Sequence, residues 1–406
     1  SMVFSRTVQG IGMAVFPIVF AIVQDQVPRN KIALAQGTLA SMFAFGGVLG
    51  LLAGGHIIEY FGWRSTFYSV IPISIILLIT IQRYIQVRES TRTVQSNPVS
   101  ETTGNNLAKD NKHPSRMDIK GMVLLAVTII AFLASMTLLR GPESPSPEDP
   151  EDKAGMIVVF LVSAGFASLA TFIIVERKTS FPLIDLKLIS RNPIWITNTV
   201  VIIWGICTFA IFQSIPVLVQ NPPPFGIGGT AIDAANIQLP FSISSLAFGP
   251  TSGWIISKIG STKVMKIGAS ILTMGFFGMF VFHDDAIKIA VNLAIVGIGL
   301  SLLNVGQLNI TTTSIPTTSI GVSLGTNTLL RYIGSAIGPT VAGMVMQHNL
   351  GTAEYPNSIV RTFPLMQSYD YIFLFVFLLA SITIILSLLI KKPSRDTSTQ
   401  QTGQKN

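Results

Sequence analysis

Residues 35–57, AQGTLASMFAFGGVLGLLAGGHI, contain no Asp, Glu, Lys or Arg. An α-helix needs about 20 apolar residues to cross the roughly 30 Å of hydrocarbon in a bilayer. Both the length and the composition of this stretch therefore predict a membrane-spanning helix. Gly46, Gly50 and Gly54 recur every four residues with Gly55 alongside, which predicts a helix face on which another backbone packs closely.

Similar apolar blocks recur along the whole chain between short charged segments. Hydrophobic residues make up 49% of the 406 residues and charged residues only 11%, whereas about 25% of residues are charged in soluble domains. We therefore predict an all-α, polytopic membrane protein with about eleven transmembrane helices. The predicted spans are residues 5–23, 35–57, 67–85, 119–139, 155–175, 194–216, 236–256, 265–282, 286–306, 322–346 and 370–390.

Basic residues are unequally divided between the loops that join these spans. When alternate loops are assigned to opposite sides, 20 of the 27 Lys and Arg residues fall on one side. The loop at 142–152, on the other side, is acidic and rich in proline. Because short loops rich in Lys and Arg stay in the cytoplasm, we predict a multi-pass protein of the cell membrane with a cytoplasmic C-terminus.

Few ionisable side chains fall inside the predicted spans, and Arg6 and Arg331 are the two candidates for function. A charge is costly in hydrocarbon, so it is retained where it faces a protein interior or a watery cavity. Arg6, in the segment RTVQGIG with Gln9, Gly10 and Gly12, is either a proton relay or structural charge, or an Arg that snorkels to the outer interface. The same ambiguity holds for Arg331, with the cytoplasmic end of its span as the alternative position.

A second glycine pattern accompanies Arg331. The segment IGSAIGP places Gly334 and Gly338 four residues apart and puts Pro339 directly after them. Small residues let helices approach closely, and a proline inside a span removes a backbone hydrogen bond and permits a bend. We predict a closely packed, bending helix here.

An apolar block at 194–216 carries candidate residues for a substrate cavity. Trp204, Phe209, Phe212 and Gln213, together with the methionines of 265–282, suit an adaptable apolar cavity. The alternative for each of them is a packing or lipid-facing position.

No sequence motif indicates catalysis or metal binding. The four histidines and the single cysteine, Cys207, are scattered, and no HExxH, GxSxG or Walker A pattern occurs. We therefore expect no enzyme, no metal and no cofactor. The net charge of +8 comes from short clusters rather than from one basic stripe, so we expect no nucleic-acid partner.

Taken in order, these motifs resemble those of the major facilitator superfamily, in particular its fourteen-helix drug:proton antiporters. RTVQGIG (6–12) resembles the fourth-helix motif, and FGGVLGLLAGG (45–55) resembles the fifth-helix antiporter motif, although Leu51 stands where the family usually has Pro. RYIGSAIGPTVAGMVM (331–346) resembles the thirteenth helix.

A cytoplasmic loop motif of the same family is also matched. GWIISKIGSTK (253–263) resembles the repeated loop motif through Gly253, Lys258, Gly260 and Lys263. Ser257 departs from it, because the family usually has Asp at that place. The loop motif is therefore weaker here than in the family.

The resemblance implies that the eleven spans correspond to helices four to fourteen, with the first three absent from this chain. It also implies substrate binding near the midplane and alternating access of two helix bundles. The implied divisions are 1–87 (three spans of a truncated N-terminal bundle), 88–118 (cytoplasmic linker), 119–190 (two additional spans), 191–390 (C-terminal six-helix bundle) and 391–406 (polar cytoplasmic tail).

Three functions fit these observations. The leading hypothesis is a secondary active transporter that exports small amphipathic or cationic compounds in exchange for protons. The second is a metabolite uniporter or symporter of the same fold, and the third is a truncated membrane protein that does not transport. The expected partners are a small-molecule substrate, protons, the lipid bilayer and a missing N-terminal segment of the same transporter.

Overall fold

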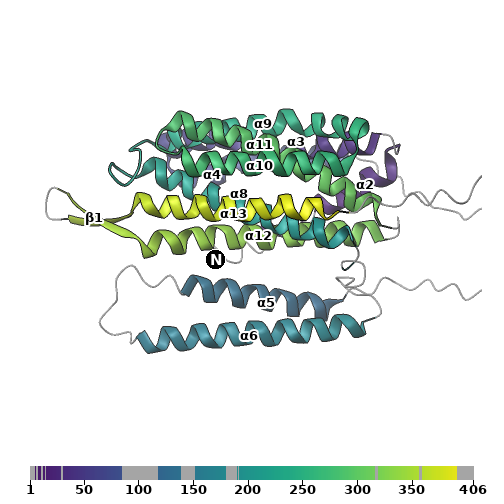
Figure 1. The fold of residues 1–406 in the computed structure, drawn as a ribbon, viewed down its shortest axis with the longest axis horizontal. Coiled ribbons are helices and arrows are strands. Elements are labelled where there is room, and N and C mark those ends of the chain that lie inside the picture. The colour runs from purple at the N-terminus through teal and green to yellow at the C-terminus, as the bar shows by residue number, and fades with distance from the viewer. Residues whose placement is uncertain are drawn as a thin grey trace, which may run out of the picture.

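The computed structural model describes residues 5, 8–10, 12–13, 15–28, 31–84, 118–138, 151–179, 190, 192–315, 319–355 and 359–390. Arg6, residues 88–117 of the predicted linker (88–118) and the tail at 391–406 lie outside these residues. Most of the described chain is helical, and the long helices run side by side along one common direction (Figure 1).

Each of the eleven predicted spans overlaps a helix, although the first, 5–23, shares only residues 15–23 with α2, and the predicted all-α membrane fold is confirmed. The helices are α2 (Val15–Gln26), α3 (Ile32–Phe61), α4 (Trp63–Tyr84), α5 (Ile119–Leu138), α6 (Glu151–Lys178), α8 (Ile194–Gln220), α9 (Ala231–Ile259), α10 (Ser261–Val281), α11 (Ala286–Thr313), α12 (Ile320–His348) and α13 (Met366–Leu388).

Nine of the helices in the described part of the chain are long and apolar enough to cross a membrane. The other two are α2, with 12 residues, and α9, which has 29 residues but a more polar sequence. α9 packs along both α3 and α11. Its serines and glutamine are therefore largely covered by protein rather than by lipid, which removes the cost of exposing them to hydrocarbon.

One hydrophobic core joins α8 to α13. Its largest fully buried side chains include Phe276 of α10 and Tyr369 and Phe373 of α13. A fully buried side chain of this size contributes about 1.5–3 kcal/mol through burial in water-soluble proteins, whereas between membrane helices the gain comes from close packing. These six closely packed helices form the frame for a binding site.

Small residues let α3 cross α9 closely. A Cβ atom added at Gly37 would collide with the backbone of Gly249, and one at Gly253 would collide with the backbone of Ala33. Gly55 also lies against α9, where its Cβ would be 3.2 Å from that of Ala235. The contact face of α3 therefore runs through residues 37 and 55.

The predicted packing face of α3 lies elsewhere. A Cβ at Gly46, Gly50 or Gly54 would meet no described atom within 4 Å. An i, i+4 glycine pattern identifies a face that can approach a neighbour. The pattern does not identify the helix that packs on that face. These three glycines do not face α9.

α5 and α6 form an antiparallel pair that lies beside the main bundle (Figure 1). The rings of Phe132 and Phe166 meet edge to face with centroids 5.1 Å apart. The Ser168 hydroxyl donates a hydrogen bond of 2.8 Å to the carbonyl oxygen of Leu124. These contacts hold the pair together, and α5 packs on α12 of the main bundle.

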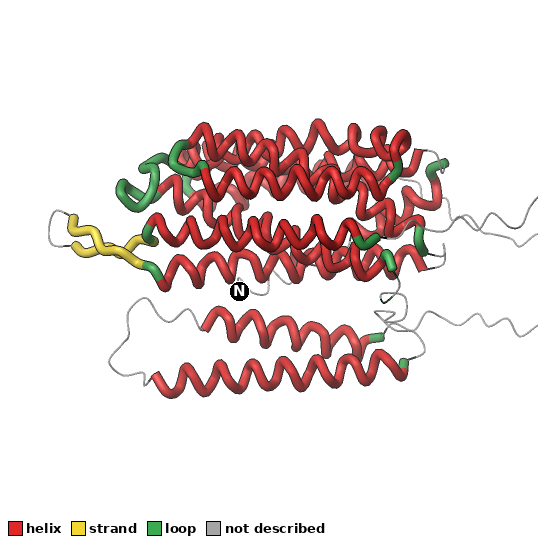
Figure 2. The backbone as a smooth tube through the Cα atoms, in the orientation of Figure 1, coloured by secondary structure: helices red, strands yellow, loops and turns green. Residues whose placement is uncertain are grey.

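A β-hairpin was not expected from the sequence. Strands β1 (Leu350–Tyr355) and β2 (Ile359–Pro364) pair antiparallel between α12 and α13, with Leu350 opposite Pro364. The hairpin projects from one end of the bundle (Figure 2). The ring of Phe363 stacks on that of Phe225 at 5.4 Å, so the hairpin packs on the loop after α8.

Basic residues gather at the end of the bundle that is opposite to the hairpin. Successive helices alternate in direction, so the last turns of α4, α6 and α9 share that end (Figure 1). These turns carry Arg83, Arg177, Lys178 and Lys258. The arrangement of the helices agrees with the two-sided distribution of charge found in the sequence.

The start of α9 is capped by its own sequence, which gives a first prediction. The Thr230 hydroxyl accepts a 3.2 Å bond from the Asp233 N–H, and the Asp233 carboxylate accepts a 2.8 Å bond from the Thr230 N–H. Replacing a Thr cap by Ala typically costs about 1 kcal/mol. We expect Thr230→Ala to lower the melting temperature of the purified protein, measured by a thermal unfolding assay in detergent. Thr230→Ser retains the hydroxyl and should melt like the wild type; equal melting of both variants would contradict the role of the cap.

Candidate functional site

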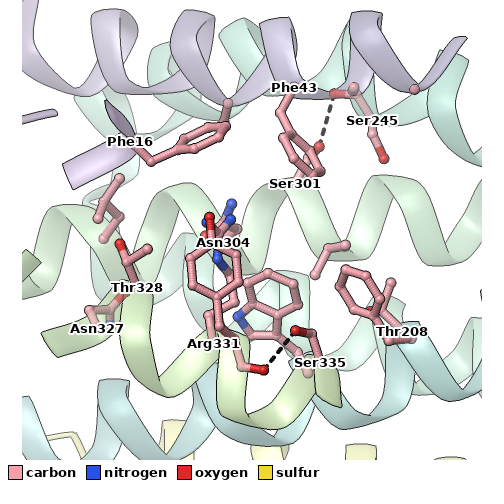
Figure 3. Close-up of a pocket in the computed structure, with 18 of the residues that line it drawn as sticks. Phe16, Phe43, Thr208, Ser245, Ser301, Asn304, Asn327, Thr328, Arg331 and Ser335 are labelled. Atoms are coloured by element: carbon pink, nitrogen blue, oxygen red, sulfur yellow. Dashed lines mark hydrogen bonds between the residues drawn. The ribbon is translucent and has the colours of Figure 1, made fainter. Parts of the chain in front are cut away.

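A cavity of about 180 Å³ lies between α2 and α3 on one side and α8, α9, α11 and α12 on the other (Figure 3). It is therefore bounded by helices from both the first and the later part of the chain. Its lining residues are Phe16, Phe20, Ala40, Phe43, Ala44, Gly47, Trp204, Thr208, Phe209, Phe212, Phe241, Ser242, Ser245, Leu300, Ser301, Asn304, Leu308, Leu324, Asn327, Thr328, Arg331, Tyr332 and Ser335.

Aromatic rings form much of the cavity wall. Phe212 packs edge to face against Phe241 with centroids 4.8 Å apart, and against Phe209 at 6.2 Å. Phe16 and Phe43 meet in the same geometry at 5.6 Å on the side of α2 and α3. Rings in these positions offer faces and edges to a flat apolar ligand.

Arg331 is the one charged residue among the lining residues that the structure describes. It lies eleven residues into the 29-residue helix α12, away from both helix ends. Its guanidinium carbon is 5.0 Å from the ring centroid of Tyr332, 5.5 Å from that of Phe16 and 6.0 Å from that of Phe43. Of the two positions considered from the sequence, Arg331 therefore occupies the interior one.

A network of side-chain amides joins three of the helices beside the cavity. Asn327 of α12 donates to Asn198 of α8 at 3.0 Å and to Gln307 of α11 at 3.3 Å. Gln307 donates in turn to Asn304 at 3.3 Å and to Asn327 at 3.5 Å. Asn304 and Asn327 also line the cavity, so part of this network faces its interior.

A second polar contact ties α3 to α11. Gln36 donates to the hydroxyl of Thr312 at 3.4 Å and accepts a bond of 3.4 Å from Asn309. These residues are buried. Hydrogen bonds thus connect α3 with α11 on the other side of the cavity, and their rearrangement is one way in which the two sides can move relative to each other.

The predicted cavity residues separate into two groups. Trp204, Phe209 and Phe212 line the cavity, whereas Gln213 is exposed and lies outside the lining. The methionines of α10 do not line it either: Met265 and Met279 are fully buried in the core. On a helix, residue 213 is rotated by about 100° from residue 212, and its side chain lies outside the cavity lining.

The glycines next to Arg331 bring α12 against α8. A Cβ added at Gly334 would collide with the carbonyl oxygen of Ile202, and one at Gly338 would collide with that of Ile206. Gly205 of α8 faces the backbone of Arg331 in the same way, with its Cβ 2.9 Å from the Arg331 oxygen. Pro339 lies inside α12, which continues to His348.

The residues of the cytoplasmic loop motif lie at the α9–α10 turn. Gly260 has a φ of +86°, a left-handed conformation that glycine adopts without strain, and it ends α9 directly before α10 begins. The ammonium of Lys258 lies 3.7 Å from the ring centroid of Trp254. Lys263 is exposed. Gly253 packs on the start of α3, so this end of α9 is held against the first helices.

The structure describes only part of the motif that begins with Arg6. Gln9, Gly10 and Gly12 are exposed, and a Cβ at either glycine would meet no described atom within 4 Å. A relay role for Arg6 remains a prediction.

Sequence reasoning missed the amide network and the polar wall of the cavity. The missed residues were nevertheless visible as polar side chains inside apolar spans: Asn304, Gln307 and Asn309 follow one another in LSLLNVGQLNI. Polar residues within a span are rare and usually face a protein interior. Their spacing of three and two residues was the available signal, because it places the first two on one face of a helix.

Comparisons with known proteins agree with this architecture. The family model described as "Major Facilitator Superfamily" matches residues 1–117 and 121–339. The multidrug transporter protein MdtP of Bacillus subtilis is 23% identical over 86% of this chain and 59% of its own length. The multidrug resistance protein Stp of Mycobacterium tuberculosis is 25% identical over 84% and 58%.

A relative with a different named cargo is also similar. The uridine/deoxyuridine transporter of Lactococcus lactis is 26% identical over 83% of this chain and 62% of its own length. The chain thus spans about three fifths of the length of these relatives.

Proposed function

This chain belongs to the major facilitator superfamily, and on that premise we propose that it is part of a secondary active transporter that exports small amphipathic compounds in exchange for protons. The observation that carries the proposal is the cavity between α2 and α3 on one side and α8, α9, α11 and α12 on the other. A cavity between two helix groups that can rock against each other is what alternating access requires. Its aromatic wall suits an apolar, flat cargo.

The proposed export direction and proton coupling rest on the resemblance to drug:proton antiporters and on the multidrug names of two relatives. Arg331 and Arg6 are the proposed charges for a relay or for structural support. We further propose that the chain is part of a multi-pass protein of the cell membrane, with its basic end and its C-terminus in the cytoplasm.

The fourteen-helix architecture is part of the same proposal. The eleven helices would correspond to helices four to fourteen, with three further helices completing the first bundle. Two observations support this division: the open glycine face of Gly46, Gly50 and Gly54, and the separate α5–α6 pair. The proposed parts are 1–87, 88–118, 119–190, 191–390 and 391–406, as defined from the sequence.

A transport assay tests the proposed function. The chain would be expressed, with and without its upstream coding sequence, in cells that lack their major efflux pumps, and loaded with amphipathic dyes of positive, zero and negative charge. We expect at least one dye to accumulate less than in control cells, and a protonophore to abolish the difference. No change in accumulation for any dye by either form would contradict the proposal.

A matched pair of variants links transport to the cavity. Thr328 lines the cavity, whereas Thr80 is exposed on α4. Thr328→Phe should fill part of the cavity and reduce dye export at least fivefold, and Thr80→Phe should leave it unchanged at equal membrane protein levels. Equal export by both variants would place the transport route elsewhere.

A metabolite carrier is the second candidate function, and the amides of Asn304 and Asn327 in the cavity favour it. Neutral amides offer both donors and acceptors, which suits a neutral polar heterocycle. The named cargo of the Lactococcus lactis relative is of that type. Uptake of labelled uridine that is independent of efflux would favour this candidate over export.

A further inference from the structure

The guanidinium of Arg331 has no partner of opposite charge in the described part of the structure. The two ion pairs there are His283–Asp370 and Lys288–Asp284, at 3.0 and 2.8 Å, and both involve residues at the hairpin end of the bundle. The aromatic rings around Arg331 stabilise its charge weakly through their negative faces. These contacts attract the charge but do not neutralise it, and the side chain is only partly exposed.

The helices that line the cavity offer no carboxylate at the level of Arg331. α8, α11 and α12 contain no Asp or Glu, and α2, α3 and α9 carry Asp25, Glu59 and Asp233 only within three residues of a helix end. The positive charge of the cavity is therefore unmatched along these six helices.

Two further polar groups in the cavity lack a partner among the described residues. The Trp204 Nε1–H and the Thr208 hydroxyl are buried, with side chains 5% and 4% exposed, and neither makes a hydrogen bond there. Both residues lie on one face of α8 and both line the cavity. A buried donor without an acceptor is unfavourable because it has lost its bonds to water, so each group is stabilised when a ligand supplies an acceptor.

Trp204 lies beside Arg331 in the bundle, and Thr208 lies one helical turn further along α8. Gly205, the neighbour of Trp204, packs directly on the backbone of Arg331. Arg331 and Thr208 both border the cavity (Figure 3). An indole N–H and a guanidinium are donors only, which leaves this part of the wall rich in donors and positively charged.

We propose that Arg331, Trp204 and Thr208 form an anion-binding subsite that selects cargo with a carboxylate or similar anionic oxygen group on an aromatic body. The anionic group binds beside Arg331 and the Trp204 Nε1–H, Thr208 offers a further hydrogen bond one turn along α8, and the ring system packs among Phe16, Phe43 and the phenylalanines of α8. This inference rests on the proposed transport function, and it assigns the cargo to anionic rather than cationic amphiphiles. A cation in the cavity would be repelled by Arg331 in a low-dielectric environment.

Equilibrium binding to the purified full chain in detergent tests the subsite without any proton gradient. Fluorescein, which is anionic, and rhodamine 6G, which is cationic, share a three-ring xanthene and would be titrated separately, with dye anisotropy as the readout. We expect fluorescein to bind at least tenfold more tightly than rhodamine 6G. Failure of the wild type to bind fluorescein, or a preference for rhodamine 6G, would overturn the proposal.

Variants separate charge from packing. Arg331→Gln should weaken fluorescein binding at least tenfold and leave rhodamine 6G binding equal or stronger, whereas Arg331→Lys should retain most of the anion preference. Trp204→Phe, which keeps a ring and removes the donor, should weaken fluorescein binding about threefold to tenfold, the equivalent of one hydrogen bond. Arg64, exposed on α4, provides the matched control: Arg64→Gln should bind both dyes like the wild type.

The result distinguishes this inference from the proposed function. If Arg331→Gln weakens both dyes equally, Arg331 supports the cavity wall and the subsite is wrong, while dye export in cells can still hold. If selective fluorescein binding is found but no dye is exported in cells, the subsite stands and the export proposal fails. A thermal melt of each variant identifies changes that come from unfolding.

Discussion

Gly338→Ala is expected to destabilise the protein by about 1–3 kcal/mol, the usual cost of forcing an extra carbon into a packed interface. The Cβ would collide with the carbonyl oxygen of Ile206 and lie 2.9 Å from the backbone nitrogen of Ala210. Backbone atoms in the middle of a helix cannot move aside as a flexible side chain can. α12 would therefore have to separate from α8, and the variant should melt at a lower temperature in detergent.

Gly325 supplies the control for this prediction. It lies in the same helix, but a Cβ there would meet no described atom within 4 Å. Because Ala is favoured over Gly inside a helix by about 1 kcal/mol, Gly325→Ala should melt at the wild-type temperature or above. Equal melting temperatures for Gly325→Ala and Gly338→Ala would show that the α8–α12 contact is not tight.

Asn327→Leu is expected to be the second large effect. The substitution removes three amide hydrogen bonds, two with Gln307 and one with Asn198. Hydrogen bonds between membrane helices are worth about 0.6 kcal/mol on average, but a buried amide left without a partner costs about 1–3 kcal/mol. We expect a loss of about 2–3 kcal/mol, measured as a lower melting temperature, together with a loss of transport.

A graded comparison checks that the network is responsible. Asn304 takes part in only one hydrogen bond of the network, which its side-chain oxygen accepts from Gln307. Asn304→Leu should therefore lower the melting temperature by less than Asn327→Leu does. If Asn327→Leu melts at or above the wild-type temperature, apolar packing replaces the amides without loss and the network has no stabilising role.

The positions of the helices could be predicted from sequence because the bilayer imposes a simple rule. A span needs about 20 apolar residues whatever its neighbours are, so the blocks from 35–57 to 370–390 were each recognisable locally. The β-hairpin at 350–364 was missed because its strands are short. Strands that pair outside the apolar blocks leave no comparable composition signal.

The functional site was predictable only in part from the sequence. Trp204, Phe209 and Phe212 were identified as cavity residues from their chemistry, yet Gln213, chosen on the same grounds, is exposed. Composition shows that a residue lies in a span. It does not show which face of the helix turns toward another helix.

By itself, the sequence determined the membrane-spanning class, the number and order of the helices and the unequal distribution of charge, because each depends on local composition. Only the tertiary structure decided which residues meet: that Arg331 lies inside a cavity with Trp204 and Thr208, that Asn327 joins α8 to α11, and that Gly37 rather than Gly46 packs on α9. Such contacts join residues as far apart as 37 and 249, and the energies that select them arise only when the helices pack together.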